Sequence, residues 1–426
     1  MIVNQDQELL QAVIKGDRDL AFQLLQQGIN ANVSDETGTN ALTYASQKGD
    51  REIVSLLIEA GANVNLSNPP HQITPIMVAA ANNHLEVVRI LIEAGANVNL
   101  TNDDGTPALA IACYKGYSEI VKVLLAHGAD LHLSDCDEDT PLKLAIKHNH
   151  PEIVQQLLAH GAIANPSKAL SETPLTLATD LGNIAIVKVL VEAGADVNIP
   201  TTAQEYPIAI AAANGHRELV SYFLKVDANI NVQDSSGDTP LHLATVENYQ
   251  DITKALLEKG AKVDARNDLG DTPLMIAALH DYVSVAMVLL YYGANPNAEN
   301  KGETPLNLAF ANNNSNMVRL LLSVGVNPDT RLAKGKTILM QACDQGNIAL
   351  MQVILKAGAD VNLQDDADAT ALMWASHRGY VDAVKLLLEN PKINLDLCNH
   401  QGYTALMLAD FNQYPEVVQL LQNASL

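Results

Sequence analysis

The stretch Gly237-Asp238-Thr239-Pro240-Leu241-His242-Leu243-Ala244, followed by the run to Gly260-Ala261, decides the fold of this chain. Thr239 and Pro240 predict a helix start. The Thr hydroxyl can accept from backbone N–H groups two or three residues on, and Pro needs no N–H at the first helical position. We expect this helix to end at Asn248 and a second helical run to end at Gly260, because both residue types enter the left-handed conformation at low cost.

The same unit recurs along the whole chain. Its helix starts fall at residues 7, 40, 74, 107, 140, 173, 206, 239, 272, 304, 337, 370 and 404, and nine of the twelve spacings are 33 residues. Nine of these thirteen positions hold Thr. A period this regular predicts a solenoid, in which each unit buries its apolar faces against its neighbours.

Thr-Pro-Leu-His-x-Ala at a period of 33 residues resembles the ankyrin repeat, and the resemblance covers residues 4–424. It implies a repeat solenoid dominated by α-helices. Each unit would be a helix-turn-helix with a β-hairpin finger, and the units would form an elongated, curved stack. We expect one solenoid over residues 1–426, with an N-terminal capping repeat over 1–36, internal repeats over 37–398 and a C-terminal capping repeat over 399–426.

The charge balance argues against several partners. The chain carries 49 acidic and 26 basic residues, a formal net charge of −23, which repels nucleic acid and anionic membrane. Four Cys provide no disulfide framework, so we expect a reducing, cytoplasmic location. A nuclear or host-cell location stays open. The N-terminus lacks the features of a signal peptide, and no apolar run is long enough for membrane insertion. We also expect the protein to be monomeric by itself.

Three segments were weighed as sites for a cofactor or metal. Lys334-Gly335-Lys336-Thr337 is similar to the end of a phosphate-binding loop but lacks the earlier glycine. Asp135 to Asp139 has the alternating acids of a calcium loop without its glycine and final Glu. His127 and His160 occupy equivalent positions one repeat apart, too far for shared zinc ligation. The sequence therefore predicts no cofactor, no metal and no enzymatic activity.

Function is expected where the repeat varies. In the family, the first helix and the fingers line a concave face that binds partners. Two positions near the end of each first helix vary freely here and specify a partner by their side chains. With Tyr206 at a helix start, the expected partner-binding residues are Lys15, Lys48, Tyr114, Lys115, Lys147, His148, Leu181, Tyr206, Asn214, Val246, Leu279, His280, His377 and Arg378.

Four of these residues form what we call the basic ladder: Lys15, Lys48, Lys115 and Lys147. The ladder could attract an acidic partner, or it could neutralise acids of nearby fingers, such as Asp35, Asp103 and Asp135. The prediction is a non-enzymatic scaffold or adaptor that binds another protein. The alternatives are a regulatory subunit or effector that acts in a larger complex, and a metal- or nucleotide-dependent enzyme.

Overall fold

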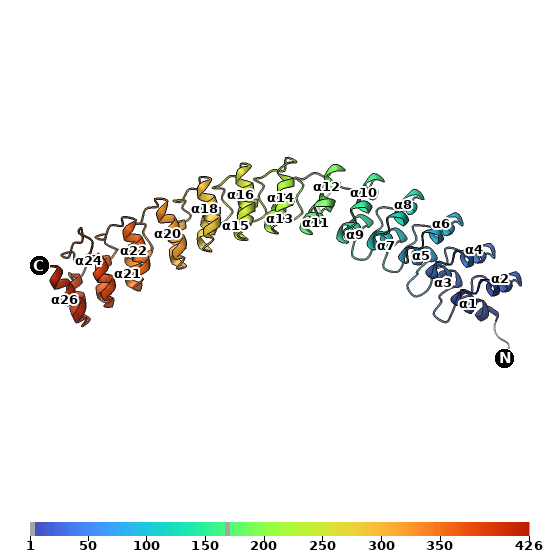
Figure 1. Ribbon diagram of the computed structural model, residues 1–426, viewed down its shortest axis with the longest axis horizontal. Coiled ribbons are helices and arrows are strands. Elements are labelled where there is room, and N and C mark those ends of the chain that lie inside the picture. The colour runs from blue at the N-terminus through green and yellow to red at the C-terminus, as the bar shows by residue number, and fades with distance from the viewer. Residues whose placement is uncertain (1–4, 167–170, 426) are drawn as a thin grey trace. The chain divides into compact units, whose positions relative to one another are not determined.

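The computed structural model describes residues 5–166 and 171–425, and it consists almost entirely of short helices arranged in pairs (Figure 1). The first four residues of the expected capping repeat 1–36, and the last residue of the expected capping repeat 399–426, lie outside this description. The two caps stay a prediction.

The first helices of the pairs are seven to eleven residues long. They are α1 (Gln5–Lys15), α3 (Ala41–Lys48), α5 (Pro75–Ala81), α7 (Ala108–Lys115), α9 (Pro141–Lys147), α11 (Pro174–Asp180), α13 (Pro207–Ala213), α15 (Pro240–Val246), α17 (Pro273–Leu279), α19 (Pro305–Ala311), α21 (Ile338–Gln345), α23 (Ala371–Arg378) and α25 (Ala405–Phe411).

The second helices run back along the first. They are α2 (Arg18–Gln26), α4 (Arg51–Glu59), α6 (Leu85–Glu93), α8 (Ser118–Ala126), α10 (Pro151–Ala159), α12 (Ile184–Glu192), α14 (Arg217–Phe223), α16 (Gln250–Glu258), α18 (Val283–Tyr291), α20 (Ser315–Ser323), α22 (Ile348–Lys356), α24 (Val381–Leu388) and α26 (Pro415–Ala424). A 3-10 helix, η1 (Ala333–Gly335), lies in one finger.

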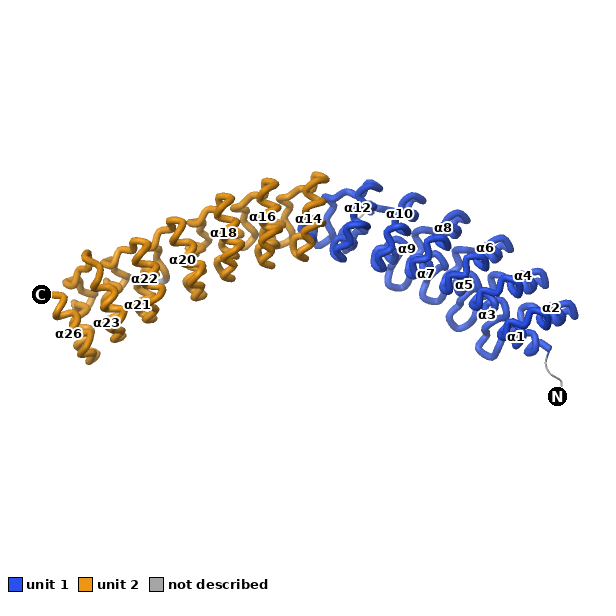
Figure 2. Tube along the Cα trace, in the orientation of Figure 1, with its two compact units in different colours: residues 1–211 blue, residues 212–426 orange. Residues whose placement is uncertain are grey.

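The chain divides into two compact units, residues 1–211 and 212–426 (Figure 2). Within each unit, first helices pack on the neighbouring first helices and second helices on the neighbouring second helices, as in the contacts of α3 with α5 and of α16 with α18. The solenoid of stacked helix pairs predicted from the sequence is confirmed within each unit.

Threonine fixes the start of the first helix in most repeats. Thr140, Thr173, Thr239, Thr272, Thr304, Thr337, Thr370 and Thr404 each accept a hydrogen bond from the backbone N–H three residues on. Asn40 does the same for α3. The prediction fails in the first repeat, where α1 already includes Gln5 rather than starting at residue 7, because no Thr-Pro marks its beginning.

The fingers are held by side chains more than by strand pairing. In the described residues we find isolated antiparallel bridges, such as Ser34 with Asn40, and no strand. In the finger that begins at Asp35, the carboxylate accepts from the N–H groups of Thr37 and Thr39, each at 2.9 Å. The Asp35 carboxylate therefore accepts hydrogen bonds from backbone N–H groups that would otherwise pair with a neighbouring strand.

An asparagine joins each of several repeats to the next. Asn99 Oδ1 accepts from the N–H of Asp130 at 2.8 Å, and its Nδ2 donates to the carbonyl oxygen of Gly128 at 3.1 Å. We call this two-way contact an asparagine bridge, and it recurs at Asn32, Asn65, Asn165 and Asn362. Asp264 and Asp329 occupy the same position and keep the accepting bond.

Candidate functional site

The last turn of each first helix carries the variable pair. In α7, Ala112 and Cys113 are fully buried, whereas the next two residues, Tyr114 and Lys115, are exposed. The helix turns by about 100° per residue, so its final residues leave the packed interior. The surface formed by these helix ends and the adjoining fingers is called the finger face below.

Within the unit 1–211, most ladder lysines are not used to neutralise finger acids. Lys147 forms an ion pair with Asp139 at 2.7 Å, and Lys48 donates to the carbonyl oxygen of Ile14. Among the described residues, no carboxylate lies within salt-bridge distance of Lys15, Lys48 or Lys115. Among the described ladder lysines, a direct ion pair with a finger acid is therefore seen at Lys147.

The finger acids named as neutralisation partners are engaged elsewhere. Asp35 accepts from the hydroxyl of Thr37, Asp103 lies 3.0 Å from the ring of His71, and Asp135 accepts from backbone N–H groups of its own finger. Their charges remain near the finger face, but they do not hold the ladder lysines. Lys15, Lys48 and Lys115 therefore have no carboxylate partner among the described residues.

An aromatic cluster joins two neighbouring repeats of this unit. The rings of Tyr114 and His148 meet edge to face, with centroids 4.2 Å apart. Lys115 Nζ lies 5.5 Å from the centre of the Tyr114 ring. Further along the same unit, Leu181 is exposed and Tyr206 is half-buried.

Within the unit 212–426, the finger face begins with apolar residues. Val246 and Leu279 are both exposed, although their helices are otherwise buried. His280 is exposed beside Leu279 and stacks on Tyr282 at a centroid distance of 5.4 Å. Asn214 is exposed at the end of α13. Val246 and Leu279 therefore present apolar surface to the solvent.

Arg378 belongs to a charged network. Its Nε donates to Asp344 Oδ1 at 2.7 Å, and Lys336 Nζ lies 2.9 Å from the other oxygen of the same carboxylate. Burial acts to raise the pKa of Asp344, but the two cations outweigh it, so the pKa is lowered. The hydrogen bond to Asp344 in turn raises the pKa of Arg378. The arginine is therefore held in place rather than free.

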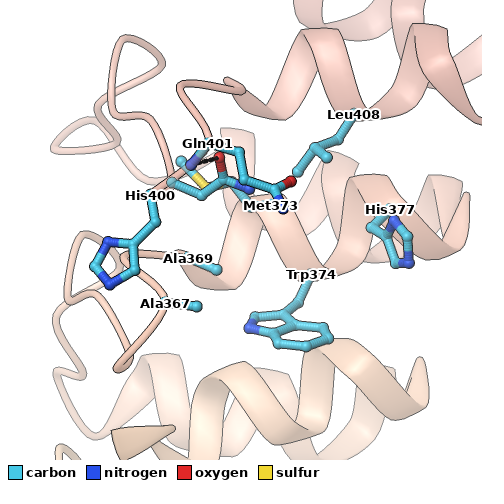
Figure 3. Close-up of a pocket in the computed structure, with 9 residues that line it drawn as sticks. Ala367, Ala369, Met373, Trp374, His377, His400, Gln401 and Leu408 are labelled. Atoms are coloured by element: carbon cyan, nitrogen blue, oxygen red, sulfur yellow. Dashed lines mark hydrogen bonds between the residues drawn. The ribbon is translucent and has the colours of Figure 1, made fainter.

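A cavity of about 420 Å³ opens beside His377 on the finger face. Figure 3 shows Trp374 and His377, both from α23, on one side and Leu408 of α25 with Gln401 on the other. Trp374 Nε1 donates to Asp365 Oδ2 at 2.9 Å. Lys336 Nζ lies 3.4 Å from the centre of the indole ring. His377 accepts from the amide of Asn412, 3.1 Å away.

A family model for ankyrin repeats, in the form of three copies, matches residues 9–102, 61–135, 109–201, 200–267, 263–331 and 339–425. The chain belongs to the ankyrin-repeat family. Ankyrin repeats are generally modules for protein–protein interaction. Within the described residues, none of the helices combines the length and apolar character needed to cross a membrane.

The ankyrin-repeat pattern alone did not single out Trp374. Tyr44 occupies the equivalent position in an earlier repeat, and its hydroxyl donates to Asp35 at 2.7 Å. Hydrogen bonds, led by that of Thr37 and including that of Tyr44, lower the pKa of Asp35 to about 2. An aromatic donor nine residues after a finger Asp is thus a signal that was present in the sequence. Met407 and Phe411 are also exposed, and the list of partner-binding residues expected from the sequence does not include them.

The segments weighed for other chemistry have structural partners in these ankyrin repeats. Thr337 caps α21, and Asp139 binds Lys143 and Lys147. His127 and His160 each contact a carbonyl oxygen of their own helix, at 2.8 Å. Over residues 5–166 and 171–425, no group of three or more His, Cys, Asp or Glu side chains is placed to hold a metal ion.

Proposed function

We propose that this ankyrin-repeat protein is a non-enzymatic scaffold or adaptor that binds another protein through its finger face. The observation that carries the proposal is the change in burial within the last turn of each first helix. Ala277 and Ala278 are fully buried, and the next residues, Leu279 and His280, are exposed. Fixed core positions thus adjoin variable exposed positions, which lets one frame specify a particular partner.

Two kinds of contact support partner binding. Lys15, Lys48 and Lys115, which form no ion pair with a described carboxylate, would attract an acidic or phosphorylated segment and speed its approach. The exposed apolar side chains Val246 and Leu279 would contribute desolvated contacts, which usually dominate affinity. A cytoplasmic location is part of the proposal, supported by the four free thiols of the chain.

The test begins with affinity capture of partners from a cell lysate, followed by kinetics with the captured protein. Replacing Lys48 and Lys115 by Glu should slow association about tenfold at low salt and reduce its salt dependence, because steering is lost. Leu279→Ala should speed dissociation about fivefold or more if the side chain is a hot spot. Surface plasmon resonance at two salt concentrations separates the two rates.

The matched control carries the same change of charge on second helices. Lys122 of α8 and Lys188 of α12 are exposed on the side away from the finger face. Replacing both by Glu should leave both rates nearly unchanged. Loss of binding in this control, together with full binding by the Lys48, Lys115 and Leu279 variants, would show that the partner uses the second helices instead.

A further inference from the structure

The last first helix, α25, exposes side chains that its counterparts bury. Met407 and Met373 both lie three residues after the capping Thr, yet Met373 is 1% exposed and Met407 is 52% exposed. Met373 lies on α23, which contacts a first helix on each side, α21 and α25. Met407 lies on α25, whose contacts among the described helices are with α23 and α26. Phe411, one turn further along α25, is 75% exposed.

The same helix also contributes to the Trp374 cavity. Leu408 of α25 lines the cavity opposite Trp374 (Figure 3). Tyr403, in the finger before α25, places its ring centroid 6.4 Å from that of Phe411. We call this the terminal surface and define it as Trp374, Tyr403, Met407, Leu408 and Phe411.

The charges around the terminal surface are negative. Residues 399–426 contain Asp410 and Glu416 and neither Lys nor Arg. Asp410 is exposed, without a salt bridge to any described residue, and Asp368 pairs with His400, which lines the cavity. Positive charge is also present, because Lys336, which lies over the Trp374 ring, and Arg378 share the single carboxylate of Asp344.

We propose that the terminal surface binds a basic amphipathic helix of a partner protein, an inference that rests on the proposed function. A large apolar side chain of that helix enters the Trp374 cavity and packs on Phe411. Its Lys or Arg side chains face Asp368 and Asp410. A second copy of this chain is the poorer occupant, because each copy carries a net charge of −23 and the two acidic surfaces repel.

Trp374 is the single tryptophan of the chain, so its fluorescence reports on this surface alone. The probe is a tryptophan-free synthetic helical peptide of Leu and Lys, compared with the same peptide carrying Glu at every Lys position. The Lys peptide should change Trp374 fluorescence in a saturable way, with a Kd at least tenfold lower than that of the Glu peptide. Equal Kd values for the two peptides would overturn the proposal.

Variants separate a specific surface from general attraction to an acidic protein. Phe411→Ser and Met407→Ser leave the charge unchanged and should each raise the Kd of the Lys peptide at least fivefold. Phe22→Ser, at an exposed position of α2, is the matched control and should leave the Kd of the Lys peptide unchanged. Unchanged affinity in the Phe411 and Met407 variants would refute the terminal surface as the site.

Two further results would overturn this inference in distinguishable ways. Concentration-dependent dimerisation that Phe411→Ser abolishes, measured by sedimentation, would assign the surface to a second copy. If a captured partner depends on Lys48, Lys115 and Leu279 but binds the Phe411→Ser variant normally, and the Lys peptide also binds that variant normally, the inference fails while the proposed function stands.

Discussion

At the scale of single residues, His242 shows how a motif residue stabilises two repeats at once. Its Nδ1 lies 2.8 Å from the hydroxyl oxygen of Thr239, and its Nε2 donates to the carbonyl oxygen of Asp271 at 3.1 Å. The ring is fully buried, and this burial lowers the pKa of His242 below its ordinary value of 6.5. The folded protein therefore binds a proton at His242 less readily than the unfolded chain does.

This lowered pKa gives stability a defined pH dependence. Below about pH 6.5 the unfolded chain takes up a proton at His242 that the folded protein does not, so the free energy of unfolding decreases as the pH falls toward the folded pKa. His242→Met copies the residue found at Met77 and Met275. This substitution should lower the free energy of unfolding by about 1 kcal/mol at pH 8, because a hydrogen bond is lost. The decrease should be smaller at pH 5.5, because the parent protein is itself destabilised there by proton uptake at His242 in the unfolded chain.

Urea denaturation followed by circular dichroism at the two pH values measures this difference. His132→Gln, at an exposed position, serves as the control and should keep the pH dependence of the parent protein. An equal loss of stability in the Met variant at both pH values would contradict a buried, neutral His242.

At the scale of elements, the asparagine bridge connects one repeat to the next at Asn32, Asn65, Asn99, Asn165 and Asn362. Asn99→Ala removes both hydrogen bonds and should cost about 0.5–1.5 kcal/mol. Asn99→Asp keeps the acceptor, as Asp264 and Asp329 do, and should cost less. Amide hydrogen exchange at Asp130, whose N–H binds Asn99 Oδ1, provides the measurement. Similar exchange rates in the Asp and Ala variants would show that the accepting bond does not matter.

Local signals explain what the sequence predicts well. Thr239 and its equivalents cap helices by contacts three residues away, so a short motif is sufficient to place each helix start. Exposure is different, because it depends on which repeat follows. Met373 and Met407 occupy the same position of the repeat, and only the packing of α25 on α23 makes one buried and the other exposed.

The candidate site was predictable in part for the same reason. The exposure of Lys48, Val246 and Leu279 follows from their place in the repeat. The Trp374 cavity does not, because it needs side chains from α23, from α25 and from the finger between them. The ion pair of Lys147 with Asp139 does not follow from the repeat position either. Whether Lys147 meets Asp135 or Asp139 depends on the geometry of the finger.

At the scale of the whole molecule, the repeat makes the chain tolerant of changes by whole periods. Deleting residues 240–272 joins Thr239 to Pro273 and restores the Thr-Pro motif at the junction. Stability in a repeat protein is approximately a sum of unit and interface contributions. This deletion of 33 residues should therefore retain a cooperative thermal transition and the helix content per residue of the parent.

A much shorter deletion should do more damage. Removing the nine residues of α16 leaves α15 without its partner and exposes apolar residues of α15 such as Leu241. We expect a lower Tm, aggregation and binding of a hydrophobic dye, all absent from the variant that lacks a whole repeat. If both variants melt alike, the repeat is not the unit of stability in this chain.

The asparagine bridges and helix packing, which join only neighbouring repeats, also determine how the chain would yield to mechanical tension. When the two ends are pulled apart, the interfaces between repeats would resist one at a time, because each asparagine bridge joins two adjacent repeats. Each repeat of 33 residues that detaches would release about 110 Å of extended chain in place of about 10 Å of stacked helix. The chain would therefore lengthen in steps of about 100 Å, and it would behave under load as a series of separate links.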